Sequence, residues 1–200
     1  VSGGGTAALA GSNTTNAITS TVLAQMDTVT QAASSSSLRV QALDSSTIQS
    51  FAGTVAGGAT SGGVASRALN FLGRTATNAD SSKLVKAEVS GGVMRTTGQM
   101  LVEASSASTI RSLSMAAGAG GTVALTGSNT TNLLEDEVIA LWDSAGMAVR
   151  PANAVKVSAR HASTIDSLAG NLAGSVGVSA GAALAVNRIG TQTLSTIKGN

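Results

Sequence analysis

Residues 176–186 read Val176-Gly-Val-Ser-Ala-Gly-Ala-Ala-Leu-Ala-Val186, and this stretch decides the fold class. Every second position from Val176 onward is Val, Ala or Leu, and the positions between them are Gly, Ser or Ala. Successive side chains of a strand point to opposite faces, so a period of two predicts a strand rather than a helix. Residues 85–89 and 155–159 alternate in the same way. The sequence therefore predicts an all-β chain.

The composition indicates how these strands form a core. Aromatic residues make up 2% of the chain, whereas 42% is hydrophobic and 24 residues are Gly. A globule usually fills its centre with a few large side chains. A chain without them must fill a narrow space many times over, as stacked repeats do. The net charge is +2 and Lys and Arg are scattered singly, so we expect no nucleic-acid partner.

Internal repeats organise the chain. The hexapeptide Gly-Ser-Asn-Thr-Thr-Asn stands at residues 11–16 and again at 127–132. Gly-rich segments recur about every 58 residues. They divide the chain into units at the following residues: 5–62, 63–120, 121–180 and a partial unit at 181–200. Solenoids need polar caps, and neither end carries one. We therefore expect residues 1–200 to be a single continuous β-solenoid segment that belongs to a longer chain.

The length of the repeat suggests the size of one coil. Dividing it by three predicts a parallel β-helix with about 19–20 residues per rung and about ten rungs in all. Gly, Ser and Asn are expected at the corners between strands. Asn13, Asn129 and Asn187 are expected at equivalent corners, where stacked amides form a ladder. Helical turns within residues 132–142 and 168–173 remain the alternative, although Gly and β-branched residues disfavour them.

A second motif, V-x-A-x-x-x-S-T-I, occurs three times, at residues 40–48, 102–110 and 157–165. Together with residues 181–197 it resembles the repeats of filamentous-haemagglutinin-like and leukotoxin-type large filamentous adhesins of Gram-negative bacteria. Near a position where that family often has Asp, the copies here have Asp44, Ser106 and His161. The resemblance implies a right-handed β-helix, export through the outer membrane, and attachment or biofilm function. It carries over no catalytic residue.

No constellation of residues predicts chemistry. The chain has no Cys, and its single His, His161, is expected on a solvated strand face beside Arg160. Residues 135–137 are all acidic, and a solvated turn or a helix start is favoured over a weak calcium contact. The other acids considered are dispersed along the chain: Asp27, Asp44, Asp80, Glu88, Glu103 and Asp166. We therefore expect no enzyme, no catalytic, cofactor-binding or metal residues, and no cofactor.

Residues 133–153 differ locally from the repeats. Trp142 is expected to pack in the core or at its edge, and Pro151 to end a strand or shape a loop. The role of this stretch stays open at the level of sequence. No uninterrupted apolar run of about 18 residues occurs, so no transmembrane segment is expected.

The leading functional interpretation is an adhesive rod that is extracellular, at the bacterial cell surface. Its expected partners are neighbouring repeats, further copies of itself end to end, and host or bacterial surface molecules. The alternatives are a subunit of a self-assembling extracellular filament or matrix and, less favoured, a polysaccharide-active β-helix. An ice-binding solenoid is weaker still, because only residues 75–77 and 191–193 have the Thr-x-Thr form.

Overall fold

The computed structural model describes all residues except 35, 75–82, 144–147, 152–153 and 200. Its regular structure is entirely β, which confirms the predicted fold class. The strands are β1 (Ser2–Gly4), β2 (Ala7–Ile18), β3 (Thr21–Ser34), β4 (Leu38–Gly58), β5 (Ser61–Leu72), β6 (Lys83–Thr96), β7 (Met100–Gly120), β8 (Val123–Asp143), β9 (Ala148–Pro151), β10 (Val155–Ser175) and β11 (Val178–Lys198). Within the described part, no helix is long and apolar enough to cross a membrane.

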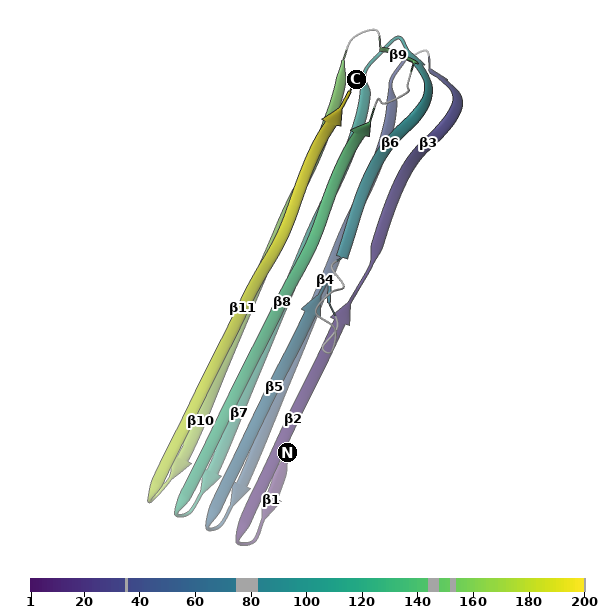
Figure 1. Cartoon of the computed structure of the whole chain (residues 1–200). Coiled ribbons are helices and arrows are strands. Elements are labelled where there is room, and N and C mark those ends of the chain that lie inside the picture. The colour runs from purple at the N-terminus through teal and green to yellow at the C-terminus, as the bar shows by residue number, and fades with distance from the viewer. Residues whose placement is uncertain (35, 75–82, 144–147, 152–153, 200) are drawn as a thin grey trace.

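The strands form two sheets in which every pairing is parallel. Sheet A has the order β1-β4-β7-β10, and sheet B has the order β2-β5-β8-β6-β3, with β11 on β8 and β9 on β6 (Figure 1). Strand β8 pairs along its length with β5 and then with β6, because these two strands follow each other in line. Each turn of the chain therefore adds one strand level to both sheets.

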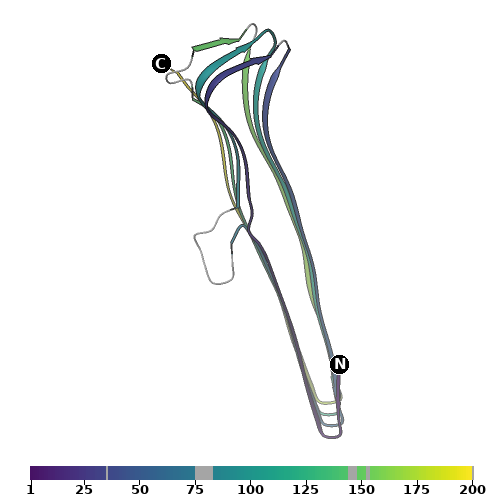
Figure 2. The same ribbon diagram turned by 90° about the vertical axis from the view of Figure 1, so that its right-hand side faces the viewer.

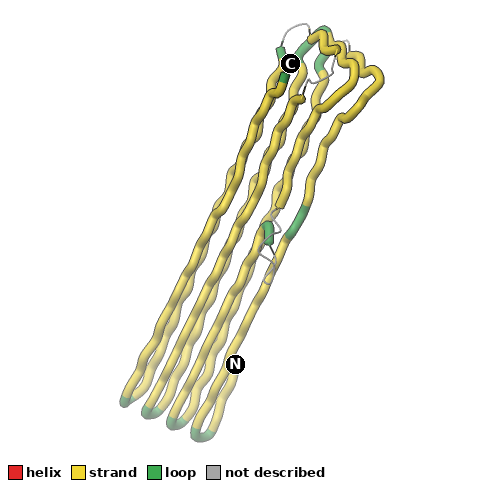
Figure 3. The backbone as a smooth tube through the Cα atoms, in the orientation of Figure 1, coloured by secondary structure: helices red, strands yellow, loops and turns green. Residues whose placement is uncertain are grey.

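The sheets lie face to face and enclose the core between them. Figure 2 shows them edge-on: they run close together over most of their length and separate toward one end. At the opposite end short turns carry the chain from sheet A to sheet B (Figure 3). Strands β4, β7, β8, β10 and β11 each have 21 residues. At about 3.3 Å per residue such a strand spans roughly 70 Å.

The rung is one whole repeat, and the predicted rung of 19–20 residues is wrong. Hydrogen-bonded equivalents on neighbouring rungs are 54, 62 and 55 residues apart, as the series Asn16, Asn70, Asn132 and Asn187 shows. The chain thus makes about four levels rather than ten. The physical reason is that the expected corner residues lie within strands, where their small or polar side chains match equivalents on the next rung.

The repeated motifs stack on one another. Residues 40–48 pair with 102–110, and these pair with 157–165, position for position. The two identical hexapeptides lie two rungs apart, with residues 65–70 between them. Sequence similarity therefore reports spatial stacking directly, because parallel in-register pairing places each residue on its equivalent.

Two local expectations are settled by β8, β9 and β10. Residues 132–142 lie in β8 and 168–173 in β10, so the helical alternative is wrong. Strand β9 ends at Pro151, as predicted. Both helical candidates contain residues that complete long parallel ladders, and this pairing overrides their local helix propensity.

Apolar layers fill the interior. The largest cluster lies toward the end where the sheets separate and includes Val85, Val102, Val138 and Trp142, whose 3% exposure confirms the predicted core packing. The second lies in the middle of the strands and the third near the turns. Their buried members are Ile48, Leu72, Ile110 and Leu134 in the middle and Ala8, Ala56, Val64 and Ala116 near the turns.

The alternating row that begins at Val176 has the predicted period but faces outward. Val178 and Leu184 are 62% and 54% exposed. The register of β11 explains this, because Asn187 pairs with Asn132 and Ile189 with Leu134, both of which are buried. A shift of one residue would turn every side chain of the strand to the other face.

The turns between the sheets also stack. The amide of Thr60 donates to the carbonyl of Thr6 at 2.9 Å, and the amide of Thr122 donates to the carbonyl of Thr60 at 2.8 Å. Glycine is required just before these turns: a Cβ on Gly58 or Gly120 would lie 2.1 or 2.0 Å from a backbone carbonyl oxygen. These glycines let the chain leave one sheet and enter the other within a few residues.

Candidate functional site

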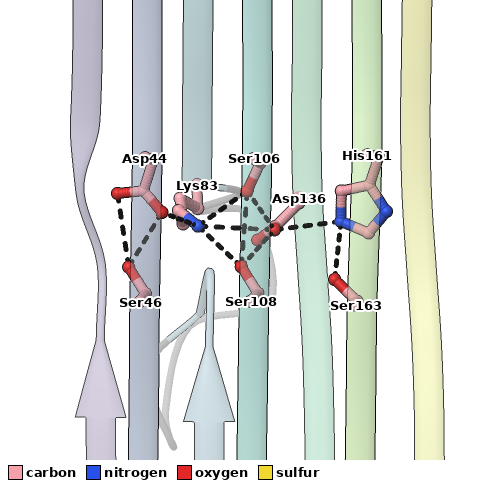
Figure 4. Close-up of polar contacts among 8 residues, drawn as sticks. All are labelled: Asp44, Ser46, Lys83, Ser106, Ser108, Asp136, His161 and Ser163. Atoms are coloured by element: carbon pink, nitrogen blue, oxygen red, sulfur yellow. Dashed lines mark hydrogen bonds and ion pairs between the residues drawn. The ribbon is translucent and has the colours of Figure 1, made fainter.

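A group of ionisable and hydroxyl side chains lies between the two sheets, and we call it the charge cluster (Figure 4). Its members come from five strands, β4, β7 and β10 of sheet A and β6 and β8 of sheet B. They are Asp44, Ser46, Lys83, Ser106, Ser108, Asp136, His161 and Ser163. Six of them occupy the same two repeat positions in β4, β7 and β10, two residues in each strand. In-register stacking of the repeats therefore brings these six side chains together.

The register explains how they meet. Asp44 and His161 both pair with Ser106, so these three residues occupy one position on successive rungs of sheet A. From sheet B, Lys83 pairs with Asp136. All these positions have the parity of the buried apolar residues in the same strands, so their side chains point into the interior. Lys83 therefore faces Asp44 across the narrow space between the sheets and has Asp136 beside it in its own sheet.

Lys83 is the centre of the cluster. Its side chain is fully buried and forms an ion pair with Asp44. The Lys83 Nζ atom also lies 3.4 Å from Oδ2 of Asp136 and donates to the hydroxyls of Ser106 and Ser108 at 3.0 and 2.8 Å. The ammonium group thus has a complete shell of acceptors, which a buried cation requires.

Asp136 is the second buried charge. Its Oδ2 atom accepts hydrogen bonds from Ser106 and Ser108 at 2.9 and 2.8 Å and lies 3.1 Å from Nε2 of His161. Its Oδ1 atom is buried and has no hydrogen-bond partner. The two carboxylate oxygens of Asp136 therefore differ, because Oδ2 has several hydrogen-bond partners and Oδ1 has none.

The buried charges of the cluster constrain how the two sheets can pack against each other. It holds two carboxylates, one ammonium group and one imidazole in a space flanked by apolar layers that include Ala104 and Ile110. Separating such charges from water is costly unless each is paired and hydrogen-bonded. Removing one partner would leave an uncompensated buried charge. The cluster therefore favours the one sheet-to-sheet register that pairs all its members.

The His161 contacts do not form a serine-protease-like relay. Ser163 Oγ lies 2.8 Å from His161 Nε2, the same nitrogen that faces Asp136. In a relay the hydroxyl and the carboxylate use opposite nitrogens of the ring, so that a proton passes across it. Among the residues that the structure describes, no three His, Asp or Glu side chains are grouped as a metal site.

Several predictions for these residues are corrected. His161 was expected on a solvated face, but its side chain is 11% exposed and points inward. Residues 135–137 were expected in a turn or helix start, yet they lie in the middle of β8, with Glu135 bound to Arg74 at 3.2 Å. Strand alternation turns Asp136 inward between its acidic neighbours.

One of the acids expected to be dispersed, Asp44, meets an acid of the 135–137 group. Asp44 and Asp136 share Lys83, whereas Glu103 pairs with Arg39 at 2.9 Å on the outer surface. Asp80 lies outside the described residues. Sequence reasoning missed Lys83, although a signal was present: Lys83 stands two residues before Val85 and so shares its inward face.

An asparagine ladder forms a second polar layer. Side-chain amides of Asn16, Asn70 and Asn132 each donate to the next member, at 2.9, 2.7 and 2.8 Å, and the last acceptor is Asn187. A ladder of stacked asparagine amides was therefore predicted correctly, and Asn187 is the one predicted member that belongs to it. The assignment of Asn13 to the ladder is wrong, because its side chain points outward and the residue pairs in register with Arg67. Asn129 is wrong for the same reason, since it lies on the outward face of β8.

The outer face of sheet A carries an exposed apolar row. Phe51 and Leu168 are each 62% exposed, and Leu113 lies between them in register. The row lines an open groove of about 590 Å³ that also contacts Arg111 and Asp166. We call Phe51, Leu113 and Leu168 the outer row. Exposed apolar side chains that gather in one patch mark contact surfaces more often than isolated ones do.

Comparison with protein-family models, curated proteins and solved structures finds no match to this chain. Fold and site therefore define it as a stack of parallel strands in two sheets with an internal charge cluster.

Proposed function

We propose that this chain is a structural and adhesive rod of a secreted bacterial surface adhesin, with a right-handed coil, that mediates attachment or cell–cell contact. The observation that carries the proposal is the outer row. Phe51, Leu113 and Leu168 occupy equivalent positions on three rungs, so the stack repeats one apolar contact element along its axis. A periodic surface of this kind suits many weak contacts acting together.

The interior supports the rod function. The asparagine ladder, the apolar layers and the parallel backbone ladders all run from rung to rung in the same direction. Stacked repeats of this type gain stability from each neighbouring interface. A rod built in this way keeps its shape while its outward side chains vary, so the interior maintains the fold and the outer face is available for binding. We place the protein outside the cell, with neighbouring repeats and surface molecules as its partners.

The outer row provides the test. Beads coated with the chain are measured for attachment to bacterial and epithelial cell layers under flow. The triple variant Phe51→Ser, Leu113→Ser and Leu168→Ser is compared with a matched control, Thr47→Ser, Thr109→Ser and Thr164→Ser, in an outward row four residues earlier on the same strands. We expect about a tenfold loss of attachment for the serine variant and none for the control. Equal attachment of all three proteins, or none by the unmodified chain, would contradict the adhesive function.

One observation favours a second function, a subunit of an end-to-end filament. Among the residues that the structure describes, strand β11 pairs with β8 alone, which leaves the other edge of its 21 residues available to a further parallel strand. Edge strands of this length are templates for pairing with another chain. Sedimentation at increasing concentration separates the two functions. Growth into long polymers that Val186→Pro blocks would favour the filament, and a monomer at all concentrations would exclude it.

A further inference from the structure

We propose that Lys83 and Asp44 condense to an intramolecular isopeptide bond, with Asp136 as the catalytic residue that carries protons. This modification is independent of whether the chain acts as an adhesin. Three observations point to it: the direct contact of an amine with a carboxylate, a second carboxylate next to the amine, and the burial of these groups between apolar layers.

The first observation concerns the reacting pair. The Lys83 side chain is fully buried and that of Asp44 is 10% exposed, and they form an ion pair. Asp44 lies in β4 of sheet A and Lys83 at the start of β6 of sheet B, so they come from opposite sheets. Ser106 and Ser108 hold the Nζ atom of Lys83 on the other side, so the amine cannot leave the pocket without breaking two further hydrogen bonds. Such fixed juxtaposition turns a bimolecular reaction into an intramolecular one.

The second observation concerns the proton carrier. Oδ2 of Asp136 lies 3.4 Å from Nζ of Lys83, while Oδ1 of Asp136 is buried and unpartnered. A carboxylate within reach of the amine can accept a proton from it and later return that proton to the departing oxygen. The geometry thus supplies one amine, one carboxyl acceptor and one separate acid–base group.

The third observation concerns the environment. Apolar layers lie on both sides of the cluster, with Ala42, Val85 and Val138 on one side and Ile48 and Leu134 on the other. In water, an ammonium and a carboxylate are favoured over an amide because both ions are well hydrated. Burial removes that hydration and makes the ion pair costly. Condensation replaces two buried charges with a neutral amide, so the interior favours the product.

The step balances without any added reactant. Asp136 takes one proton from the Lys83 ammonium, and the freed electron pair on Nζ attacks Cγ of Asp44 to form the carbon–nitrogen bond. The hydroxyl of Ser46, 3.0 Å from Oδ2 of Asp44, donates to the oxygen on which negative charge builds up. The carbon–oxygen bond then breaks, and the oxygen leaves as water with two protons that were on nitrogen. One ammonium and one carboxylate become one amide and one water.

The product would join the two sheets covalently. In the remaining site Asp136 keeps its bonds to Ser106 and Ser108 and faces His161, so one carboxylate and one imidazole are left as a pair. A covalent link between sheets would resist the separation of the sheets under pulling force. This is a property of the fold itself and is testable on the isolated chain.

The test is the intact mass of the purified chain after full denaturation. We expect a mass lower than that calculated from the sequence by one water molecule. Trypsin should leave the bond after Lys83 uncut and release a branched peptide that joins residues 40–67 to residues 75–86. This peptide distinguishes the isopeptide from a cyclic imide at Asp44, which also loses water but is not branched. A chain of full calculated mass, or a water loss without the branched peptide, would overturn the proposal.

Variants assign the roles. Asp136→Asn keeps the shape of the side chain but accepts no proton, so we expect full mass together with an unchanged far-ultraviolet circular dichroism spectrum. Lys83→Arg keeps the charge but lacks the reactive amine, so we expect full mass here too. Lys86→Arg, which makes the same exchange at a lysine of β6 that pairs with Glu88 outside the charge cluster, is the matched control and should still lose water. A water loss in Lys83→Arg would refute the assigned amine, and one in Asp136→Asn would refute the assigned proton carrier.

Discussion

Replacement of Asn132 by Ala removes an inner member of the asparagine ladder. The Asn132 side chain is fully buried, accepts a hydrogen bond from Asn70 at 2.7 Å and donates one to Asn187 at 2.8 Å. Its partners keep other bonds, because Asn70 still donates to Ser50 and Asn187 still accepts from Ser167. No partner is therefore left entirely unpaired, which limits the penalty.

The magnitude follows from these contacts. Two hydrogen bonds are lost at about 0.5–1.5 kcal/mol each. The missing amide group leaves a small cavity that adds about 1 kcal/mol. We therefore expect Asn132→Ala to lower the free energy of unfolding by about 2–4 kcal/mol. The matched control is Asn16→Ala at the edge of the ladder, where one bond to Asn70 is lost and the side chain is only partly buried, so the expected loss is about 0.5–1.5 kcal/mol.

The assay is urea unfolding followed by the fluorescence of Trp142, the single tryptophan, and by circular dichroism. The difference between the variants is read at an unchanged slope of free energy against urea, so that it reports stability rather than a change in the unfolded state. If Asn132→Ala lowers the free energy of unfolding no more than Asn16→Ala does, the ladder does not act as a set of coupled rung-to-rung bonds.

Three other perturbations test separate parts of the structure. Gly120→Ala should lower the free energy of unfolding by about 1–3 kcal/mol, because the new Cβ would lie 2.0 Å from a carbonyl oxygen. Gly127→Ala is the control, since no atom lies within 4 Å of its new Cβ, and it should change the free energy by less than about 0.5 kcal/mol. The two variants are compared by their urea midpoints. Ser90 donates to Asp27 at 2.9 Å and, with Thr28, lowers the pKa of Asp27 from its usual 3.8. Because the pKa of Asp27 is lower in the folded state, its carboxylate stabilises the fold at pH values above its usual pKa, and this stabilisation is lost as the pH falls through the pKa of the folded state. Ser90→Ala should therefore raise the pKa of Asp27 in an NMR titration and make the stability depend less on acid pH. Trp142→Ala should cost about 3–5 kcal/mol by circular dichroism melting, and a change below about 1 kcal/mol would mean that the core cluster is wrongly placed.

Local patterns predicted the strands and the stacked motifs. The alternation at residues 85–89 identified an inward row of a strand, and the three V-x-A-x-x-x-S-T-I copies identified residues that stack on one another. Both follow from properties that are encoded within a few residues: the pleat of a strand and the matching of like with like in a parallel register.

The candidate site was only partly within reach. The sequence aligned Asp44, Ser106 and His161 at one repeat position, and the structure places them on successive rungs. It did not show that Lys83 and Asp136 come from the opposite sheet to meet them. Contacts between sheets join residues that lie far apart along the chain and on different repeat positions, so no periodicity within the sequence reports them.

By itself the sequence determined the β class, the two-residue period and the identity of the stacked repeats, because these depend on neighbouring residues and on likeness between units. Only the tertiary structure decided that one repeat is one rung, which face each strand turns inward, and which charges meet. The physical reason is that a two-residue period is compatible with either face of the strand pointing inward and with any neighbouring strand. The register of pairing between strands decides which face and which neighbour the structure has. For β11 that choice is fixed where Asn187 meets Asn132 and Ile189 meets Leu134, which turns the row from Val176 to Val186 outward.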